Sequence, residues 1–589
     1  MADHAHSSGN TPAPPPLTPG ILPNLRFDLI AGFLVFLIAM PLCLAIARAS
    51  GYPPIAGIWT AVIGGIICSL ISNSELTIKG PAAGLIVIAI GAVTDLGNEF
   101  GQGQSDADRA MLGYRLALGV GVTAGVIQIL LGLLRAGRLV DFFPLTPVHG
   151  MLASIGLIII AKQAYDVLGA SPEKGALPIE LLINLPGAFK HINPEIAAIG
   201  FTGLLILFGL PFIPLKWVKR VPAQLFVLIA ALVLGMVFDL EHRHTYIFQD
   251  DFLDSAHEAV FEVGPRFLVD MPDVLENPAS AFATPKFDGL ATATGLKYVL
   301  LFTLIGSLES LLSAKAIELI DPWRRKTDFD RDLLAVGVAN TICAAIGALP
   351  MISEIVRSKA NIDNGARTRR ANLYHGLFLL VFAIAASGLI HRILIAALAA
   401  MLVYTGYRLA SPAEFVRTYR VGSEQFIVFV VTIITTLSTD LLIGIGVGIA
   451  TEVAFHLWHG APMTGLLKSQ VEVVPEGDRI VVLKVRRAAV FSNWLGIRAA
   501  ILKQAEGRDE VVIDLSDTRL ADHSVMEKLH QLEREFSEAG KRLSLIGLDS
   551  HTPLSRHPLA ARKCAGRKET AAGEPAPSAA AVSSESNSG

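Results

Sequence analysis

Leu-Phe-Thr-Leu-Ile-Gly-Ser-Leu-Glu-Ser-Leu-Leu-Ser-Ala, residues 301–314, is an apolar stretch that holds one carboxylate, Glu309, near its middle. The stretch predicts a membrane helix, and because lipid penalises a buried charge, Glu309 is expected to face a partner or a water-filled cavity. Further along, residues 348–358 have the sequence Ala-Leu-Pro-Met-Ile-Ser-Glu-Ile-Val-Arg-Ser, in which Pro350 interrupts the apolar pattern. A helix broken within the bilayer leaves backbone N–H groups that must line a cavity, and its positive N-terminal end favours an anion.

The composition indicates a membrane protein. Of 589 residues, 52% are hydrophobic and 17% are charged, a charged share below the roughly 25% of soluble domains. Apolar runs of about 17–25 residues recur from Leu25 to His456, and each is long enough to cross a bilayer. This pattern excludes a soluble enzyme. The four cysteines show no zinc or disulfide spacing. We expect no nucleic-acid partner and no cofactor other than a coupling ion, Na⁺ or H⁺.

Fourteen membrane spans are expected, seven in each half of an α-helical polytopic protein. Those of the first half are placed at 27–47, 54–73, 81–95, 114–134, 147–165, 194–213 and 222–238, with a short helix near 178–185. Those of the second half are placed at 296–314, 333–348, 351–360, 372–387, 389–405, 425–438 and 441–457. The third span of each half is short and follows a proline. Such paired interruptions are typical of an inverted-repeat transporter whose binding site lies where the repeats meet.

The chain changes composition at three points. The segments are a disordered N-terminal arm, 1–20; a membrane domain, 21–462; a small α/β domain of alternating strands and helices, 463–559; and a disordered tail, 560–589. Lys and Arg gather in the loops that follow even-numbered spans, Lys79 among them, and this assigns those loops to the cytoplasm. Both termini are therefore expected in the cytoplasm.

Four patches of the sequence resemble the sulfate permease family of anion transporters. They are residues 28–57, Lys79-Gly80-Pro81-Ala82-Ala83, residues 308–314 and residues 349–368. Within them, Pro41-Leu42-Cys43-Leu44 and the run from Gly80 to Leu85 look like the bacterial branch that is often found beside or fused to carbonic anhydrase. The likeness to that branch implies bicarbonate as the substrate.

The C-terminal α/β segment resembles a STAS domain, the regulatory module usual in this family. Phe491-Ser492-Asn493 and Val512-Ile513-Asp514-Leu515 carry the resemblance. Where many STAS domains have Asp-Ser, this chain has Asp522-His523-Ser524, and we interpret Ser524 as a helix N-cap; the alternative is a phosphorylation site.

The family resemblance implies a seven-plus-seven inverted repeat divided into a core domain and a gate domain. The anion is expected between the N-termini of the third and tenth spans, and the core is expected to move like an elevator against a dimeric gate. The resemblance also implies a multi-pass homodimer in the lipid bilayer of the cell inner membrane. The STAS domain could hold a cytoplasmic partner.

Small residues mark the expected anion site. The predicted substrate-binding residues are Gly80, Ala82, Ala83, Gly84, Ile352 and Ser353. Residues without bulky side chains let backbone N–H groups approach a ligand closely. Ile352 and Ser353 are expected to open the tenth span, where Ser353 can donate to an anion or cap the helix. The alternative for the small residues is tight helix packing.

A second set of residues is expected to bind a coupling cation. The set is Glu309, Thr303, Ser310, Ser313 and Glu354. The hydroxyls recur at spacings of three and four, so they form a polar stripe beside Glu309. Glu309 is expected to coordinate Na⁺ or carry a proton; the alternative is a buried partner for a basic group. Glu354 stands three residues before Arg357, so it either pairs with that residue or takes the cation.

The leading hypothesis is secondary active transport of a small inorganic anion, bicarbonate first, driven by Na⁺ or H⁺. The alternatives within transport are a sulfate or dicarboxylate substrate and uncoupled anion exchange. A membrane-anchored signalling protein with a STAS output is the alternative from another class.

Overall fold

A computed structural model of the chain describes residues 20, 22–137, 144–173, 176–215, 221–248, 259–272, 274, 276–476 and 479–564. The chain divides into a membrane unit, residues 1–419 with 423–452, and a C-terminal unit, residues 420–422 with 453–589. The predicted disorder of 1–20 and 560–589 falls outside the described residues, except at Gly20 and residues 560–564.

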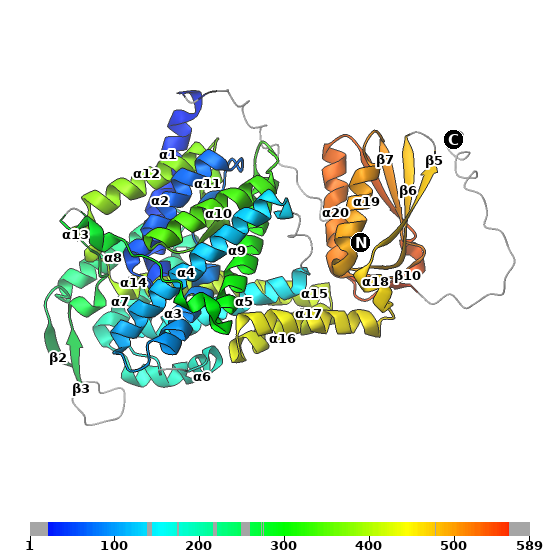
Figure 1. Ribbon diagram of the computed structural model, residues 1–589. Helices are drawn as coiled ribbons and strands as arrows, with labels where there is room; N and C mark the ends of the chain where they lie inside the picture. The colour runs from blue at the N-terminus through cyan, green and yellow to red at the C-terminus, as the bar shows by residue number, and fades with distance from the viewer. Residues whose placement is uncertain are drawn as a thin grey trace. The chain divides into compact units, whose positions relative to one another are not determined.

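The first half of the membrane unit is helical (Figure 1). Its helices are α1 (Leu22–Ala49), α2 (Pro54–Ile71), α3 (Ile86–Phe100), α4 (Asp106–Leu133), α5 (Leu145–Leu168), α6 (Pro178–Ala188), α7 (Pro194–Gly209) and α8 (Ala223–Val237). Proline occupies the first turn of α2, α6 and α7, where a missing N–H breaks no helical hydrogen bond. The short helix expected near 178–185 is confirmed as α6.

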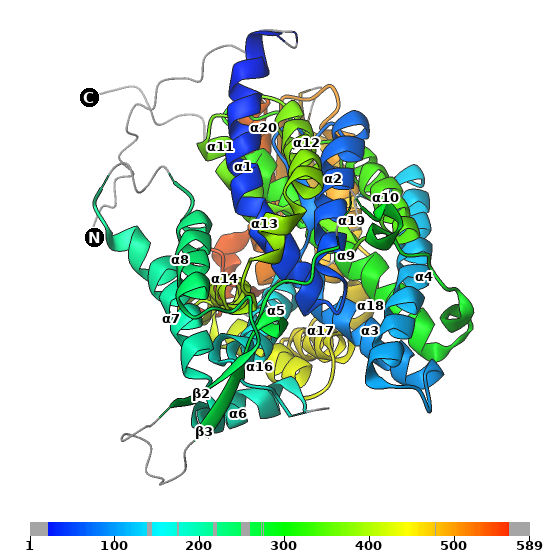
Figure 2. The same cartoon turned by 90° about the vertical axis from the view of Figure 1, so that its left-hand side faces the viewer.

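A polar segment separates the halves. It contains an antiparallel hairpin of β2 (His244–Phe248) and β3 (Ala259–Val263), which projects from the helices in both views (Figures 1 and 2).

The second half is also helical. Its helices are α9 (Ala293–Ile320), α10 (Phe329–Ile346), α11 (Ile355–Asp363), α12 (Arg370–Ala385), α13 (Ser387–His391), α14 (Ile395–Leu409), α15 (Pro412–Val421), α16 (Ser423–Ser438) and α17 (Leu441–Trp458). The expected span at 389–405 is wrong at its start, because the chain is extended between α13 and α14. There the N–H of Val269 donates to the carbonyl of Ile393 over 2.9 Å, so the polar segment takes a backbone group that a helix would have used.

The multi-pass membrane character is confirmed. Among the described residues, 8 helices are long and apolar enough to cross a membrane, and α8, α12 and α16 are shorter apolar helices. In the bundle, α12 packs on α1 and α2, α4 packs on α3 and α10, and α5 packs on α14 and α16. A Cβ added to Gly65 of α2 would lie 2.7 Å from the Cα of Gly376 of α12, so the two backbones meet directly.

Two short extended segments interrupt the bundle. They are β1 (Ile78–Pro81), which precedes a 3-10 turn at Ala83–Leu85 and then α3, and β4 (Met351–Glu354), which precedes α11. The expectation that Ile352 and Ser353 open a helix is therefore wrong, because α11 begins at Ile355. Pro350 favours an extended residue before it, and the residues after it pair with β1 instead of coiling.

The C-terminal unit is a mixed sheet with two long helices. Its strands are β5 (Gln470–Glu476), β6 (Ile480–Ala489), β7 (Glu510–Asp514), β8 (Thr518–Ala521), β9 (Arg542–Ile546), β10 (His551–Pro553) and β11 (Arg562–Cys564). They are ordered β10-β11-β8-β6-β7-β9, with β5 also paired to β6. α19 (Trp494–Gln504) and α20 (His523–Glu538) cover one face in Figure 1. The expected α/β domain is confirmed, and β11 extends its sheet past residue 559.

Asp522, and not Ser524, is the N-cap of α20. Its Oδ1 accepts from the N–H of Val525 over 2.7 Å, and its Oδ2 accepts from the N–H of Phe491 over 2.6 Å. The prediction for Ser524 is wrong because the helix begins at His523, two residues before the Val525 start that a Ser524 N-cap would give.

Truncation after Pro462 should leave the membrane unit folded. The main membrane core ends at Ile445, whereas the sheet core begins at Val481, so the deletion removes no side chain from the former. We expect a single size-exclusion peak in detergent and the melting temperature of the full chain. Truncation after Ser438 is the control and should aggregate, because it also removes Leu441 and Ile445 from the core. Aggregation of both truncations would mean that the membrane unit depends on the C-terminal unit.

Candidate functional site

The two interrupted segments form an antiparallel ladder inside the membrane unit. Its pairs are Ile78 with Glu354, Lys79 with Ser353, Gly80 with Ile352, and Pro81 with Met351. The ladder thus brings together three predicted anion-binding residues, Gly80, Ile352 and Ser353, from distant parts of the sequence. Ala82, Ala83 and Gly84 follow directly after β1.

Side chains from five helices, α2, α9, α10, α11 and α12, bind the backbone around the ladder. The hydrogen bonds run from Ile78 N to Ser358 Oγ (2.8 Å), Lys79 N to Asn372 Oδ1 (3.2 Å), Leu349 N to Thr60 Oγ1 (2.8 Å), Met351 N to Asn340 Oδ1 (2.7 Å) and Ser353 N to Ser310 Oγ (3.1 Å). Backbone donors at membrane depth cost free energy unless they are paired, so these bonds stabilise the extended chain.

The helix ends beside the ladder have no side-chain caps. The 3-10 turn at Ala83–Leu85, α3 and α11 have no side-chain hydrogen bond at their N-caps, Ala82, Leu85 and Glu354. In contrast, α4, α7, α9 and α10 are capped by Ser105, Asn193, Thr292 and Asp328. Uncapped N–H groups at a helix start are donors that suit an anion.

Arg357 of α11 places a buried cation at these helix ends. Its side chain belongs to a residue that is 1% exposed; Nη2 donates to the carbonyl of Pro81 over 3.1 Å, and Nη1 lies 3.5 Å from Cys43 Sγ. A Cβ on Gly80 would lie 2.5 Å from Nη1, so glycine is what lets the guanidinium approach β1. Within the described part of the chain, no carboxylate pairs with Arg357, and its Nε has no hydrogen-bond partner.

The predicted ion pair between Glu354 and Arg357 is therefore not formed. The i,i+3 rule applies to two helical residues, but Glu354 is the N-cap of α11 and has an extended backbone, φ −100° and ψ 115°. One of its carboxylate oxygens, Oε1, is buried without a hydrogen-bond partner.

Glu309 of α9 lies against Gly84. A Cβ on Gly84 would be 2.1 Å from Oε1 of Glu309, and the other oxygen, Oε2, is buried without a partner. The described residues offer Glu309 no basic partner, which removes the alternative that it balances a buried cation. Glu354 is near enough for the two charges to interact.

The hydroxyls predicted to surround Glu309 have different surroundings. Thr303, Ser310 and Ser313 are buried. Thr303 Oγ1 has no hydrogen-bond partner, whereas Ser310 Oγ lies 3.2 Å from Ser353 Oγ. Three buried oxygens, on Glu309, Glu354 and Thr303, thus remain without a partner and suit a cation or protons.

The sequence analysis did not predict a buried ion pair that lies at the ladder. Nζ of Lys79 lies 2.7 and 2.8 Å from the two carboxylate oxygens of Asp332 in α10, and the residues are 1% and 0% exposed. Counting Lys79 among the cytoplasmic loop charges was therefore wrong. Its position directly before Gly-Pro-Ala-Ala, inside an apolar segment, was the available signal of burial.

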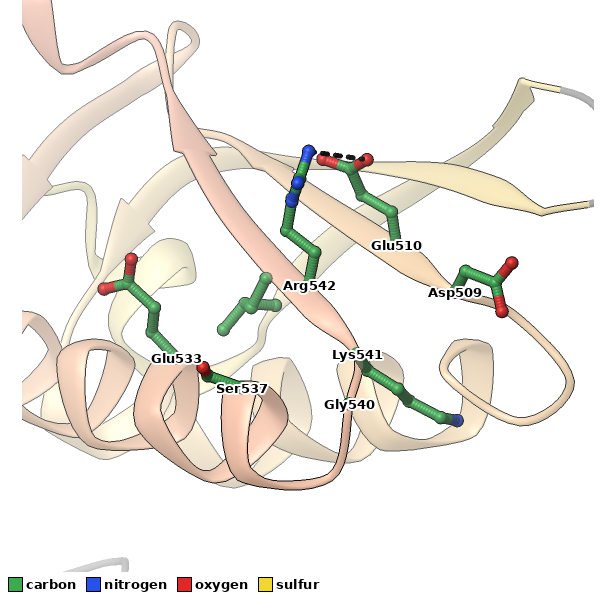
Figure 3. Close-up of a pocket in the computed structure, with 8 residues that line it drawn as sticks. Asp509, Glu510, Glu533, Ser537, Gly540, Lys541 and Arg542 are labelled. Atoms are coloured by element: carbon green, nitrogen blue, oxygen red, sulfur yellow. Dashed lines mark ion pairs between the residues drawn. The ribbon is translucent and has the colours of Figure 1, made fainter.

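A separate hollow of about 520 Å³ lies on the C-terminal unit (Figure 3). Glu510 of β7 and Arg542 of β9 are cross-strand neighbours and form an ion pair of 4.0 Å, while the Lys541 side chain points away from them. Asp509 and Glu533 add negative charge at the same hollow. This mixture of charges on an open surface does not resemble the buried cation and helix ends of the membrane unit.

Comparisons with known proteins identify the family of the chain. The model of the sulfate permease family matches residues 25–432. The bicarbonate transporter BicA of Picosynechococcus is 24% identical over 473 residues, which cover 80% of this chain and 76% of that protein. Sulfate transporter 4.1 of Arabidopsis thaliana is 24% identical over 566 residues, which cover 90% of this chain and 76% of that protein.

Two solved structures share the fold. The transmembrane domain of a cyanobacterial BicA aligns with a TM-score of 0.57 at 22% identity, covering 71% of this chain and 97% of that one. The anion transporter SLC26A9 aligns with a TM-score of 0.63 at 12% identity, covering 90% of this chain and 85% of that one.

Proposed function

The chain belongs to the sulfate permease family of inorganic anion transporters, and we propose that it carries bicarbonate by secondary active transport. Both bicarbonate and sulfate transporters occur among its relatives. Bicarbonate is preferred because Leu42-Cys43-Leu44 and the run from Gly80 to Leu85 resemble the branch that accompanies carbonic anhydrase.

The buried and unpaired guanidinium of Arg357 is the observation that carries the anion site. Glu354 acts on Arg357 electrostatically without forming an ion pair. Once the coupling ion neutralises Glu354, the guanidinium is a buried charge without a counter-ion, which costs several kcal/mol, and a bound anion would supply that counter-ion. Backbone N–H groups after Ala82 and Glu354 would add donors, because no side chain caps those helix ends. Gly80, Ala83 and Gly84 keep the approach free of bulk, and Ile352 and Ser353 line it from β4.

Glu309 and Glu354 are proposed to bind the coupling ion. Two carboxylates near an anion repel it, and the repulsion is strong in a medium of low dielectric constant. Na⁺ or H⁺ at these groups would remove the repulsion, so cation and anion would bind together. The hydroxyls of Thr303, Ser310 and Ser313 are the further oxygens proposed for Na⁺.

The finer architecture is proposed on the same basis. A ladder between the interrupted segments of the two halves is what an inverted repeat predicts. We propose fourteen spans in two repeats, a core and a gate domain, elevator motion and a homodimer in the cell inner membrane. Both termini and the STAS domain, with any partner it holds, would lie in the cytoplasm, since the remaining loop charges still favour that orientation without Lys79.

Uptake into proteoliposomes tests the substrate. Labelled bicarbonate should enter, unlabelled bicarbonate should compete better than sulfate, chloride or succinate, and a Na⁺ or pH gradient should drive accumulation. Stronger competition by sulfate or succinate would assign a sulfate or dicarboxylate transporter. If neither the Na⁺ gradient nor the pH gradient changes the rate or extent of uptake, the protein is an uncoupled anion exchanger. If no anion enters at all, the signalling alternative is favoured.

Replacing Arg357 by glutamine should abolish anion transport. The amide removes the buried positive charge, and we expect the apparent affinity for bicarbonate to fall by at least about tenfold, which is about 1.4 kcal/mol. Lys359→Gln is the matched control, because Lys359 is two residues further along α11, is exposed and pairs with Asp363. Equal affinity in the two folded variants would place the anion elsewhere.

Glu309→Gln should fold but lose cation-driven accumulation. The substitution keeps the side-chain shape beside Gly84 and removes the charge that the coupling ion neutralises. Downhill exchange should survive, because the helix ends that bind the anion are unchanged. Concentrative uptake is measured under an imposed Na⁺ gradient and then under an imposed pH gradient. Accumulation equal to the parent under both would make Glu309 a structural group and leave Glu354 as the coupling residue.

A further inference from the structure

The Lys79–Asp332 ion pair lies next to the proposed anion site. Lys79 and Ser353 are cross-strand partners in the ladder, so their side chains share one face. Nζ of Lys79 contacts Ser353 Oγ as well as both oxygens of Asp332. Lysine has three N–H donors, so all three are already used by these acceptors.

Both carboxylate oxygens of Asp332 have hydrogen-bond partners. Beyond Lys79, it accepts from the hydroxyl of Ser72 and lies 3.4 Å from Ser353 Oγ. It stands in the first turn of α10, where the helix dipole favours a negative charge. Asp332 therefore places a carboxylate within a few ångströms of the Lys79 ammonium group and cancels its charge locally.

The charge balance around the ladder follows from this pairing. Lys79 and Arg357 are the two buried cations, but only Lys79 has a carboxylate partner among the described residues. The two acids around the ladder that form no ion pair among the described residues, Glu309 and Glu354, each have one buried oxygen without a partner and are those assigned above to the coupling ion; Glu354 interacts with Arg357 only through the electrostatic field. Neutralising both carboxylates takes two monovalent cations or protons, and with both bound the uncompensated charge is the single positive charge of Arg357.

We propose that the Lys79–Asp332 pair determines the valence of the anion that the site accepts. By neutralising Lys79, Asp332 leaves one positive charge for the substrate, which matches a monovalent oxyanion such as bicarbonate. A divalent anion would bring a second negative charge that meets no cation in a site of low dielectric constant. Lys79 is a positioning residue in the parent: it orients the Ser353 hydroxyl and has no donor left for the anion. The inference rests on the proposed function.

Charge variants of the pair test the proposal. Asp332→Asn releases the positive charge of Lys79, whereas the double variant Lys79→Gln, Asp332→Asn is neutral like the parent. The readout is the inhibition of labelled bicarbonate uptake by unlabelled sulfate and succinate, divided by the inhibition by unlabelled bicarbonate and chloride. A melting curve in detergent establishes that each variant is folded.

The expected result is a shift of this ratio toward divalent anions by about tenfold in Asp332→Asn, and its return to the parent value in the double variant. A merely structural pair would weaken all anions equally and leave the ratio unchanged, which overturns the proposal. If Asp332→Asn does not fold, Asp332→Ser takes its place, since its hydroxyl can still bond to Ser72. If neither single variant folds, the test uses the double variant. Its pair is neutral like that of the parent, so an inhibition ratio different from the parent's would contradict control of anion valence by charge.

Uptake by the unmutated protein distinguishes a failure of this inference from a failure of the proposed function. A parent that prefers sulfate or succinate, or carries no anion, defeats the bicarbonate assignment itself. A parent that carries bicarbonate, together with a folded Asp332→Asn variant of unchanged ratio, defeats the inference alone.

Discussion

Backbone polar groups at membrane depth must find partners within the protein, and the β1–β4 ladder is how this chain meets that constraint. Two helices, α3 and α11, are preceded by the extended segments β1 and β4, which pair with each other. Asn340, Thr60, Ser310, Ser358 and Asn372 bind N–H groups in and next to the ladder. The starts of the 3-10 turn before α3 and of α11 keep N–H groups without side-chain caps, and the pairing of β1 with β4 brings these two helix starts together.

Buried ionisable side chains, like buried backbone groups, need partners within the protein. Among the described residues around the ladder, Lys79 and Asp332 form an ion pair, whereas Arg357, Glu309 and Glu354 form none. A protein that only needed stability would not keep three unmatched ionisable groups at such a cost. Unmatched groups of both signs within one region are instead what a protein needs if anion and cation are to arrive and leave together.

The sequence predicted what depends on long patterns. Apolar runs identified the membrane unit, and alternating strands and helices identified the C-terminal sheet, because each pattern extends over many residues. It failed at Met351–Glu354, since four residues are too few to distinguish a strand from a helix. The pairing expected between Glu354 and Arg357 failed with it, because an i,i+3 contact presupposes a helix at both residues.

The sequence also did not reveal which individual charged side chains are buried. Loop charges are assigned from their position along the chain, so Lys79 was counted as cytoplasmic, although the fold turns it inward onto Asp332. Asp332 lies one residue before a predicted span, where an acid is ordinary. Only the crossing of β1 and α10 makes the two residues partners, and sequence spacing carries no record of that crossing.

The contact between Gly84 and Glu309 indicates how ion and anion sites can depend on each other without a long relay. Gly84 belongs to the turn whose open N–H groups are proposed for the anion, and the carboxylate of Glu309 occupies the space that a side chain at position 84 would fill. Neutralising Glu309 therefore changes the potential at that turn directly, because a charge acts strongly over a few ångströms of low dielectric constant. By linkage, an anion bound at the turn must raise the affinity of Glu309 for the cation by the same factor. Direct electrostatic interaction between adjacent groups is thus sufficient to couple binding at the two sites thermodynamically. In the proposed elevator motion, the core domain then has only to move both sites as one unit.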